Sequence, residues 1–301
     1  MRAASPPPPL QRGRRLVTAA ALASALAAQL CAGAAPAAAK LSGTPRAYTA
    51  SSGAVTATLT ATEFAGGAGA PTTFQDLHLQ ILRAGASAYS AAVSSPHCQP
   101  CGLEGFSGAP PPVQVAVLQP GGEPDVVVDL YTGGAHCCSI VQVLSYDPAS
   151  ATYLTAERDF GDPGALLADV AGNGSMQFES ADDRFAYAFA PYAYSGLPMQ
   201  ILAFGSGGFH DVTRSFPAAV AADAARWLKG FRAERRHGLG NGLIAAWAAD
   251  EELLGHRRLV ARTLAREARH GRLRSREHYG PSNGAFVRAL MRFLKRTGYI
   301  R

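Results

Sequence analysis

Short runs that alternate apolar and polar residues fill the chain between about residue 48 and residue 216. Each run ends at Gly, Pro, Asn or Asp, which is typical of antiparallel strands. The pattern is clearest over 54–62, where threonine recurs at every second position. Other predicted strands cover residues 77–83, 113–118, 125–131, 139–144, 199–204 and 209–212.

The spacing of the apolar positions changes to a helical one after residue 217. In the first such segment the apolar residues fall on one face, namely Val220, Ala224, Trp227 and Leu228. We predict three further helices: one from 243 to near Gly255, one over 259–266, and one over 286–294 with Asn283 as its N-cap. The short, Gly-containing links between them indicate a small bundle.

These patterns predict an α+β fold, in which an antiparallel β-meander or partial propeller-like β domain precedes a small C-terminal helical bundle. Residues 40–216 form the predicted β-rich domain, and residues 217–301 form a basic helical region.

Residues 1–39 have the pattern of a signal peptide. Arg12, Arg14 and Arg15 come directly before an uncharged Ala/Leu-rich stretch that ends in small residues before Lys40, which is typical of an export signal with its cleavage site. No other run is long and apolar enough to span a bilayer. We therefore expect a secreted or extracytoplasmic protein.

Charge is divided unevenly along the chain. Residues 40–217 contain six Lys/Arg and 15 Asp/Glu, whereas residues 218–301 contain 18 Lys/Arg and seven Asp/Glu. The basic helices either dock on the acidic β region, face solvent, or attract an anionic component of the cell envelope. We expect no nucleic-acid partner, because the basic segments lack interleaved aromatic residues.

Two segments 52 residues apart share the order strand, Gly-containing loop, strand: 117–126 and 169–178. The run Asp169-Val170-Ala171-Gly172-Asn173-Gly174 resembles the calcium-loop core of FG-GAP and VCBS-type repeats, which occur in integrin-like propellers and exported bacterial proteins. The segment 131–138, with its Gly-Gly-Ala-His-Cys-Cys sequence, is similar to one that recurs in such exported proteins. The resemblance covers roughly residues 113–215 and leaves out the helices.

The resemblance implies oxygen ligands for calcium in these loops. In the second unit Asp169 and Asn173 match ligand positions, but Ala171 has lost a donor and Gln177 replaces a later Asp. In the first unit only Asp125 remains. Calcium at the second loop is thus the one cofactor that the resemblance implies.

Four cysteines lie beyond the predicted signal peptide: Cys98, Cys101, Cys137 and Cys138. An even number of cysteines in an exported chain favours structural disulfides. Rings closed by near neighbours are strained, so we expect two bridges that join the 96–101 loop to the Cys-Cys turn. The alternative is a zinc or copper(I) site, in which His97 and His136 join the four thiolates.

No nucleophile elbow, zinc-protease helix, P-loop or dinucleotide fingerprint occurs in the chain, and no catalytic residue is predicted. Two carboxylate pairs, Asp159/Asp162 and Asp182/Asp183, would suit acid–base chemistry if a cleft brought them together, but turn and cap roles are commoner for such residues. The aromatic run 185–194 predicts a buried sheet face or the wall of a binding groove.

We therefore predict an exported, non-catalytic β module that binds or scaffolds at the envelope. The alternatives are a hydrolase of an envelope polymer and a Cys/His metal-binding protein.

Overall fold

The computed structural model describes residues 43–67, 71–103, 111–134, 137–276 and 279–300. All of them belong to one compact unit, Leu41–Arg301. The predicted signal peptide, residues 1–39, lies outside the described residues.

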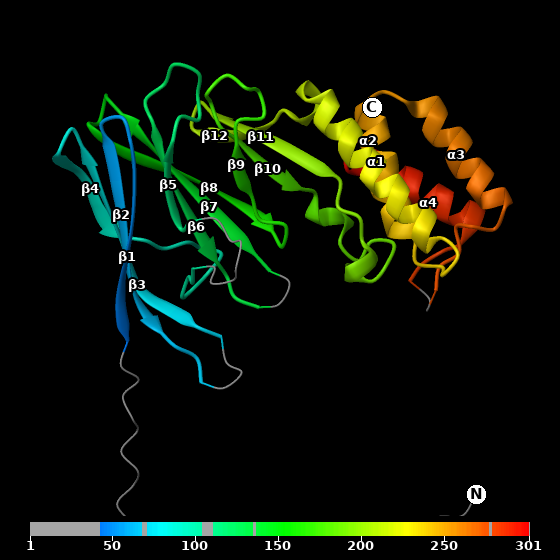
Figure 1. Cartoon of the computed structure of the whole chain (residues 1–301), viewed down its shortest axis with the longest axis horizontal. Helices are drawn as coiled ribbons and strands as arrows, with labels where there is room; N and C mark the ends of the chain where they lie inside the picture. Colours follow the sequence, from blue (N-terminus) through cyan, green and yellow to red (C-terminus); the bar gives the residue numbers. More distant parts are fainter. Residues whose placement is uncertain (1–42, 68–70, 104–110, 135–136, 277–278, 301) are drawn as a thin grey trace, which may run out of the picture. The chain divides into compact units, whose positions relative to one another are not determined.

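The β region consists of three antiparallel sheets of four strands each (Figure 1). The first sheet contains β1 (Thr44–Ser52), β2 (Val55–Phe64), β3 (Thr73–Arg83) and β4 (Ala86–Ala92). The middle sheet contains β5 (Val113–Ala116), β6 (Asp125–Tyr131), β7 (Ser139–Asp147) and β8 (Thr152–Gly161). The third sheet contains β9 (Leu166–Ala168), β10 (Gln177–Ala181), β11 (Met199–Gly205) and β12 (Gly208–Asp211). Each sheet is a meander, because its strands pair in chain order.

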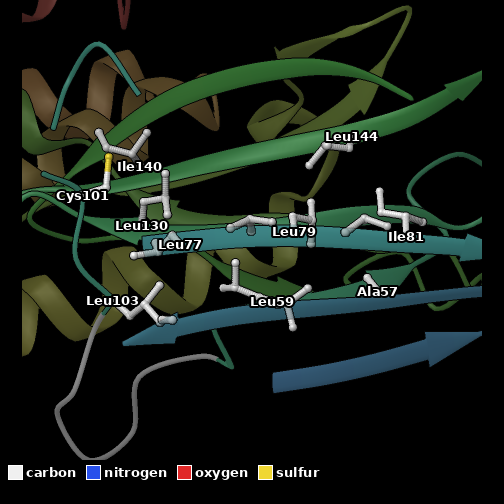
Figure 2. Close-up of a cluster of buried hydrophobic side chains, with 14 of the residues drawn as sticks. Ala57, Leu59, Leu77, Leu79, Ile81, Cys101, Leu103, Leu130, Ile140 and Leu144 are labelled. Carbon is white, nitrogen blue, oxygen red and sulfur yellow. The ribbon is translucent and has the colours of Figure 1, made fainter. Parts of the chain in front are cut away.

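The middle sheet is buried on both faces. Leu130, Ile140 and Leu144 pack against Leu59 and Leu79 of the first sheet (Figure 2). The intervening residues of β6 and β7 pack against the third sheet, where they join a cluster that includes Phe178 and Leu202: Val127, Val141 and Val143. Burial on both faces explains why β6 and β7 read as nearly continuous apolar runs.

The first sheet instead shows simple alternation. In β2 the residues Val55, Ala57, Leu59 and Ala61 are buried while the threonines between them are not. The alternation predicted over 54–62 is therefore confirmed.

Four helices follow the sheets: α1 (Pro217–Glu234), α2 (Asn241–Leu253), α3 (Arg257–Arg269) and α4 (Asn283–Arg296). The predicted α+β fold with a C-terminal helical region is thus confirmed. One boundary differs by a residue, because Ser282 is the N-cap of α4 and Asn283 is its first residue.

The core of the helical region also contains residues from before position 217. The run 185–194 is not a strand; it starts at the last residue of one short helical turn, η1 (Asp183–Phe185), and ends with a second, η2 (Tyr192–Tyr194). Its Phe185 and Phe189 are buried against Tyr299 and Phe286, with ring centroids 5.5 Å and 5.4 Å apart. Gly242 lets α2 approach η2, since a Cβ there would lie 2.4 Å from the Tyr194 carbonyl oxygen.

Polar contacts also join the helices to the sheets. The buried carboxylate of Asp223 in α1 accepts from the Met199 N–H of β11 at 3.0 Å and from the Trp227 indole at 2.8 Å. Arg214, in the turn η3 (Thr213–Ser215), donates to the carbonyl oxygens of Leu253 at 2.8 Å and Tyr299 at 3.0 Å. These bonds fix the ends of α2 and of the chain beside the third sheet.

Candidate functional site: a carboxylate pocket

Three segments that are distant in sequence, together with Cys138, line an open pocket of about 540 Å³. They are the C-terminal end of β8, the turn 181–184 after β10, and β11 with β12. We call this space the carboxylate pocket, since its charged lining consists of four carboxylates and two guanidinium groups: Asp159, Asp182, Asp183, Asp211, Arg158 and Arg184. Asp159, Asp182 and Asp183, from the two carboxylate pairs noted in the sequence, therefore line one concave site.

Asp183 carries the least satisfied carboxylate of the pocket. Its Oδ1 atom is buried and accepts no hydrogen bond from the residues that the structure describes. Burial raises the pKa of Asp183, and the nearby negative charges of Asp162, Asp159 and Asp182 raise it further. Because the negative charge of Asp162 also raises the pKa of Asp183, all four predicted carboxylates lie close to one another.

A glycine makes room for this carboxylate. Gly161 ends β8 with a φ of +68°, and a Cβ at this position would lie 2.7 Å from Asp183 Oδ2. The Gly161 N–H donates to Asp159 Oδ1 at 2.8 Å, which holds the Asp159 side chain at the strand end. Only glycine combines this left-handed backbone with such a close approach.

Asp182 has a different role from its neighbour. Its carboxylate is 2% exposed, accepts two bonds from the Arg184 guanidinium at 2.8 Å and 2.6 Å, and accepts one from the Tyr299 hydroxyl at 2.9 Å. The bond to Asp182 also raises the pKa of Arg184. Asp182 is therefore a structural anchor for the C-terminal segment, and Asp183 is the group left for a ligand.

A second pocket of about 340 Å³ adjoins the first and shares Arg184, Gln200 and Asp211 with it. Its remaining lining includes Arg214 and Tyr299, which link the third sheet to the helices. Sequence reasoning missed Arg158, Arg184, Gln200 and Asp211, since only the fold brings them together. Arg158 and Arg184 adjoin predicted aspartates, but nothing in the local sequence assigns them to a common site.

The cysteines pair differently from our expectation. The structure joins Cys98 to Cys101 and Cys137 to Cys138, rather than bridging the loop to the turn. The 98–101 turn brings the two Cα atoms to 4.7 Å, a separation that ordinary disulfides accept. Both side chains are buried in the first core, where Figure 2 shows Cys101.

Cys138 also belongs to the wall of the carboxylate pocket. Thr132 holds it on both sides, because the Cys138 N–H donates to Thr132 Oγ1 at 2.8 Å and the Thr132 N–H donates to the Cys138 carbonyl at 3.1 Å. The neighbouring Cys137 is exposed.

The Cys/His alternative has no assembled metal site in the described part of the chain, where no group of three His, Cys, Asp or Glu side chains is placed to hold an ion. His97 lies 3.6 Å from a Glu157 carboxylate oxygen at the surface. His136 lies outside the described residues.

The loop that resembles a calcium site is held by its own hydrogen bonds. Asp169 accepts from the N–H groups of Asn173 at 3.0 Å and Gly174 at 2.9 Å, and these backbone bonds, that of Gly174 foremost, lower its pKa. Asn173 Oδ1 accepts from the N–H and hydroxyl of Ser175. Gln177 closes the loop by accepting from Val170 and Ala171. The oxygens of Asp169 and Asn173 thus already have donors.

Comparison with known proteins gives two curated relatives. A protein of Synechocystis sp. named as a probable thylakoid lumen protein is 27% identical over 230 residues, which are 65% of this chain and 64% of that protein. An uncharacterised protein of Sinorhizobium fredii is 29% identical over 136 residues, which are 44% of this chain and 21% of that protein. The chain thus spans less than two thirds of either relative's length.

No family model and no solved structure matches the chain. The resemblance to FG-GAP and VCBS repeats therefore stays a prediction. Within the described residues, no helix has both the length and the apolar character needed to cross a membrane.

Proposed function

We propose that the protein works outside the cytoplasm as a non-catalytic binding module. The leader-like segment 1–39 supports export. The Synechocystis relative, which is named as a probable thylakoid lumen protein, supports a compartment beyond the cytoplasm.

The carboxylate pocket is the proposed binding site, and its ligand carries a positively charged amine. The observation that carries this assignment is the buried, unpartnered Oδ1 of Asp183 in a pocket that also contains Asp159. A buried carboxylate oxygen without a donor is costly, and an ammonium group would supply both the donor and the opposite charge. Because Asp182 is already occupied by Arg184 and Tyr299, Asp183 and Asp159 are the residues that receive the amine.

The proposal is tested by calorimetric titration with small amines, namely lysine, arginine, putrescine and spermidine. At least one should bind, and Asp183→Asn should weaken that binding about tenfold or more, since a charge-assisted bond is lost. Glu123→Gln is the matched control, because it removes one negative charge at an exposed pair with Arg83. Equal loss in both variants, or no binding by any amine, would refute the assignment.

Two further tests probe the same site. Binding should weaken as pH falls through the raised pKa of Asp183, because the neutral acid no longer pairs with an ammonium. Gly161→Ala should weaken binding without any change of charge, since the added methyl collides with the Asp183 carboxylate. A wild-type affinity in Gly161→Ala would show that the position of Asp183 does not matter.

A hydrolase of an envelope polymer is the second candidate, favoured by one observation. Asp183, whose pKa is raised, shares a pocket with Asp159, and a protonated acid beside a carboxylate is the pairing that glycoside cleavage uses. In this case the purified protein should release reducing ends from an envelope polysaccharide, and Asp183→Asn and Asp159→Asn should each abolish the release while the fold is retained. Amine binding without any turnover would favour the binding module.

A further inference from the structure

The positive charge of the helical region is concentrated in its last part. Residues 257–301 contain 13 Lys/Arg and two Asp/Glu. One of the two acids is Glu267 of α3, which is buried and pairs with Arg235, Arg266 and Arg272. The exposed surface of α3 therefore carries arginines and no acid.

The arginines of α3 form a single stripe. Arg258, Arg262, Arg266 and Arg269 are spaced four, four and three residues apart, and this spacing keeps them on one face of a helix. All four are exposed, while Val260 and Leu264 of the opposite face are buried in the bundle. Packing in the bundle core therefore does not explain why the four arginines share one face.

Most of this charge is not neutralised by the protein itself. Among the described residues, Arg258, Arg262 and Arg269 form no ion pair, and Arg266 shares Glu267 with two other arginines. Arginines that repeat every turn repel one another along the helix, so the stripe costs stability in the absence of a partner. Such an arrangement favours an anionic partner.

An exposed leucine interrupts the arginines. Leu259 is 41% exposed and lies in one hollow with Arg258 and Arg262. Ala261 and Ala265 line a second hollow with Arg262, Arg266 and Arg269. Long arginine side chains around an exposed apolar group match the lipid headgroup region, where the leucine enters the apolar boundary and the guanidinium groups bind phosphates.

We propose that the exposed face of α3, made of Arg258, Leu259, Arg262, Arg266 and Arg269, docks on an anionic lipid bilayer. This inference rests on the proposed location outside the cytoplasm, at an envelope or lumenal membrane, and is independent of the ligand of the carboxylate pocket. Docking is peripheral, because the apolar face of α3 stays in the bundle core.

The test is sedimentation of the compact unit Leu41–Arg301 with vesicles of phosphatidylglycerol mixed with phosphatidylcholine, or of phosphatidylcholine alone. The protein should bind the anionic vesicles, and added salt should release it. The triple variant Arg258→Gln, Arg262→Gln, Arg269→Gln should lower the vesicle partition coefficient about tenfold or more, because each arginine near the surface contributes to attraction.

A second triple variant, Arg288→Gln, Arg292→Gln, Lys295→Gln, removes the same charge from exposed positions of α4 and is the matched control. Equal losses from both triples would mean that net charge, and not the α3 face, drives binding, and would overturn the proposal. Retained binding in the α3 triple would overturn it as well.

The substitution Leu259→Ser separates lipid from soluble polyanion. It should weaken vesicle binding at constant charge while leaving any binding to dextran sulfate unchanged. If Leu259→Ser has no effect on vesicle binding, the partner is a polyanion and not a bilayer. Amine titrations of the α3 triple keep the two proposals separate, since the carboxylate pocket should bind its amine as the wild type does.

Discussion

Two buried aspartates illustrate how strongly the surroundings of a residue decide its role. Asp223 in α1 accepts bonds from Arg226, Trp227 and the backbone of Met199. Asp250 in α2 is fully buried, and neither of its oxygens accepts a bond from an N–H or O–H donor of the described residues. Its burial, together with the charge of Asp223, raises the pKa of Asp250 to about 10. The folded protein therefore holds Asp250 as a neutral acid that donates to Asp223.

Asp250→Asn should therefore remove a pH dependence of stability. The folded state binds a proton that the unfolded state releases above the ordinary carboxyl pKa of about 4. The contribution of this group to the free energy of unfolding thus falls as pH rises from about 4 toward 10. Urea unfolding at pH 5, 7 and 8.5 should show a shallower decline in the variant. An unchanged decline would mean that Asp250 is ionised in the folded protein.

The pairing of the cysteines can be tested by the masses of proteolytic fragments. Proteolysis at Glu104 and Glu123 separates the first cysteine pair from the second. Without reductant the two fragments should separate, each two hydrogens lighter than its reduced form, because the pairs close within themselves. Fragments that stay joined until reduction would restore the crosswise bridges, and free thiols would reopen the Cys/His metal site.

Among the elements, the predictable ones were those whose burial follows a simple period or, as in β6 and β7, runs continuously along the strand. The alternation of β2 and the helical spacing of α1 are visible in the sequence because one face of each is buried. β1 was missed because none of its residues is buried, and β8 was missed because Glu157, Arg158 and Asp159 interrupt its apolar pattern. Two of these charged residues, Arg158 and Asp159, line the carboxylate pocket, so the residues of the site disrupt the strand pattern there.

The candidate site was predictable only as separate residues. Asp159, Asp162, Asp182 and Asp183 stood out as pairs, yet no local pattern distinguished Asp182, which binds Tyr299 from the far end of the chain, from Asp183. That distinction depends on contacts between positions 117 residues apart, which a pattern of neighbours does not contain.

The 169–177 loop depends on the Asp169 carboxylate, which accepts two backbone hydrogen bonds. Asp169→Ala should increase amide hydrogen exchange over residues 172–175, since two backbone N–H groups lose their acceptor. Calcium should neither bind the wild-type protein in calorimetry nor restore protection in the variant. Stoichiometric calcium binding that Asp169→Ala abolishes would instead support the site implied by the repeat resemblance.

At the scale of the whole molecule, the sheets and helices are expected to unfold together. Asp223 of α1 accepts a hydrogen bond from β11, and Tyr299 donates one to Asp182. Arg214 donates to the carbonyl oxygens of Leu253 at the end of α2 and of Tyr299 near the end of the chain. Because of these polar contacts and the packing of Phe185 and Phe189 among the helices, we expect no separate unfolding of the parts before and after residue 216.

Leu130→Ala tests this coupling. Leu130 is buried between the first and middle sheets, and its truncation should cost about 2–5 kcal/mol. Both tryptophans, Trp227 and Trp247, lie in helices, so their fluorescence reports on the helical region alone. Their thermal transition should move down together with the circular dichroism of the sheets, whereas exposed Leu154→Ala should move neither. A tryptophan transition that stays in place would show two independent units.

The double burial of the middle sheet has a consequence for synthesis. A chain emerges from the ribosome N-terminus first, so β5–β8 appear before the sheet that covers their second face. Until β9–β12 follow, Val127, Val141 and Val143 present an uncovered apolar surface, which is the kind of surface that associates with other chains. An incomplete chain that contains β5–β8 but lacks β9–β12 is therefore expected to associate with other chains more readily than the complete one.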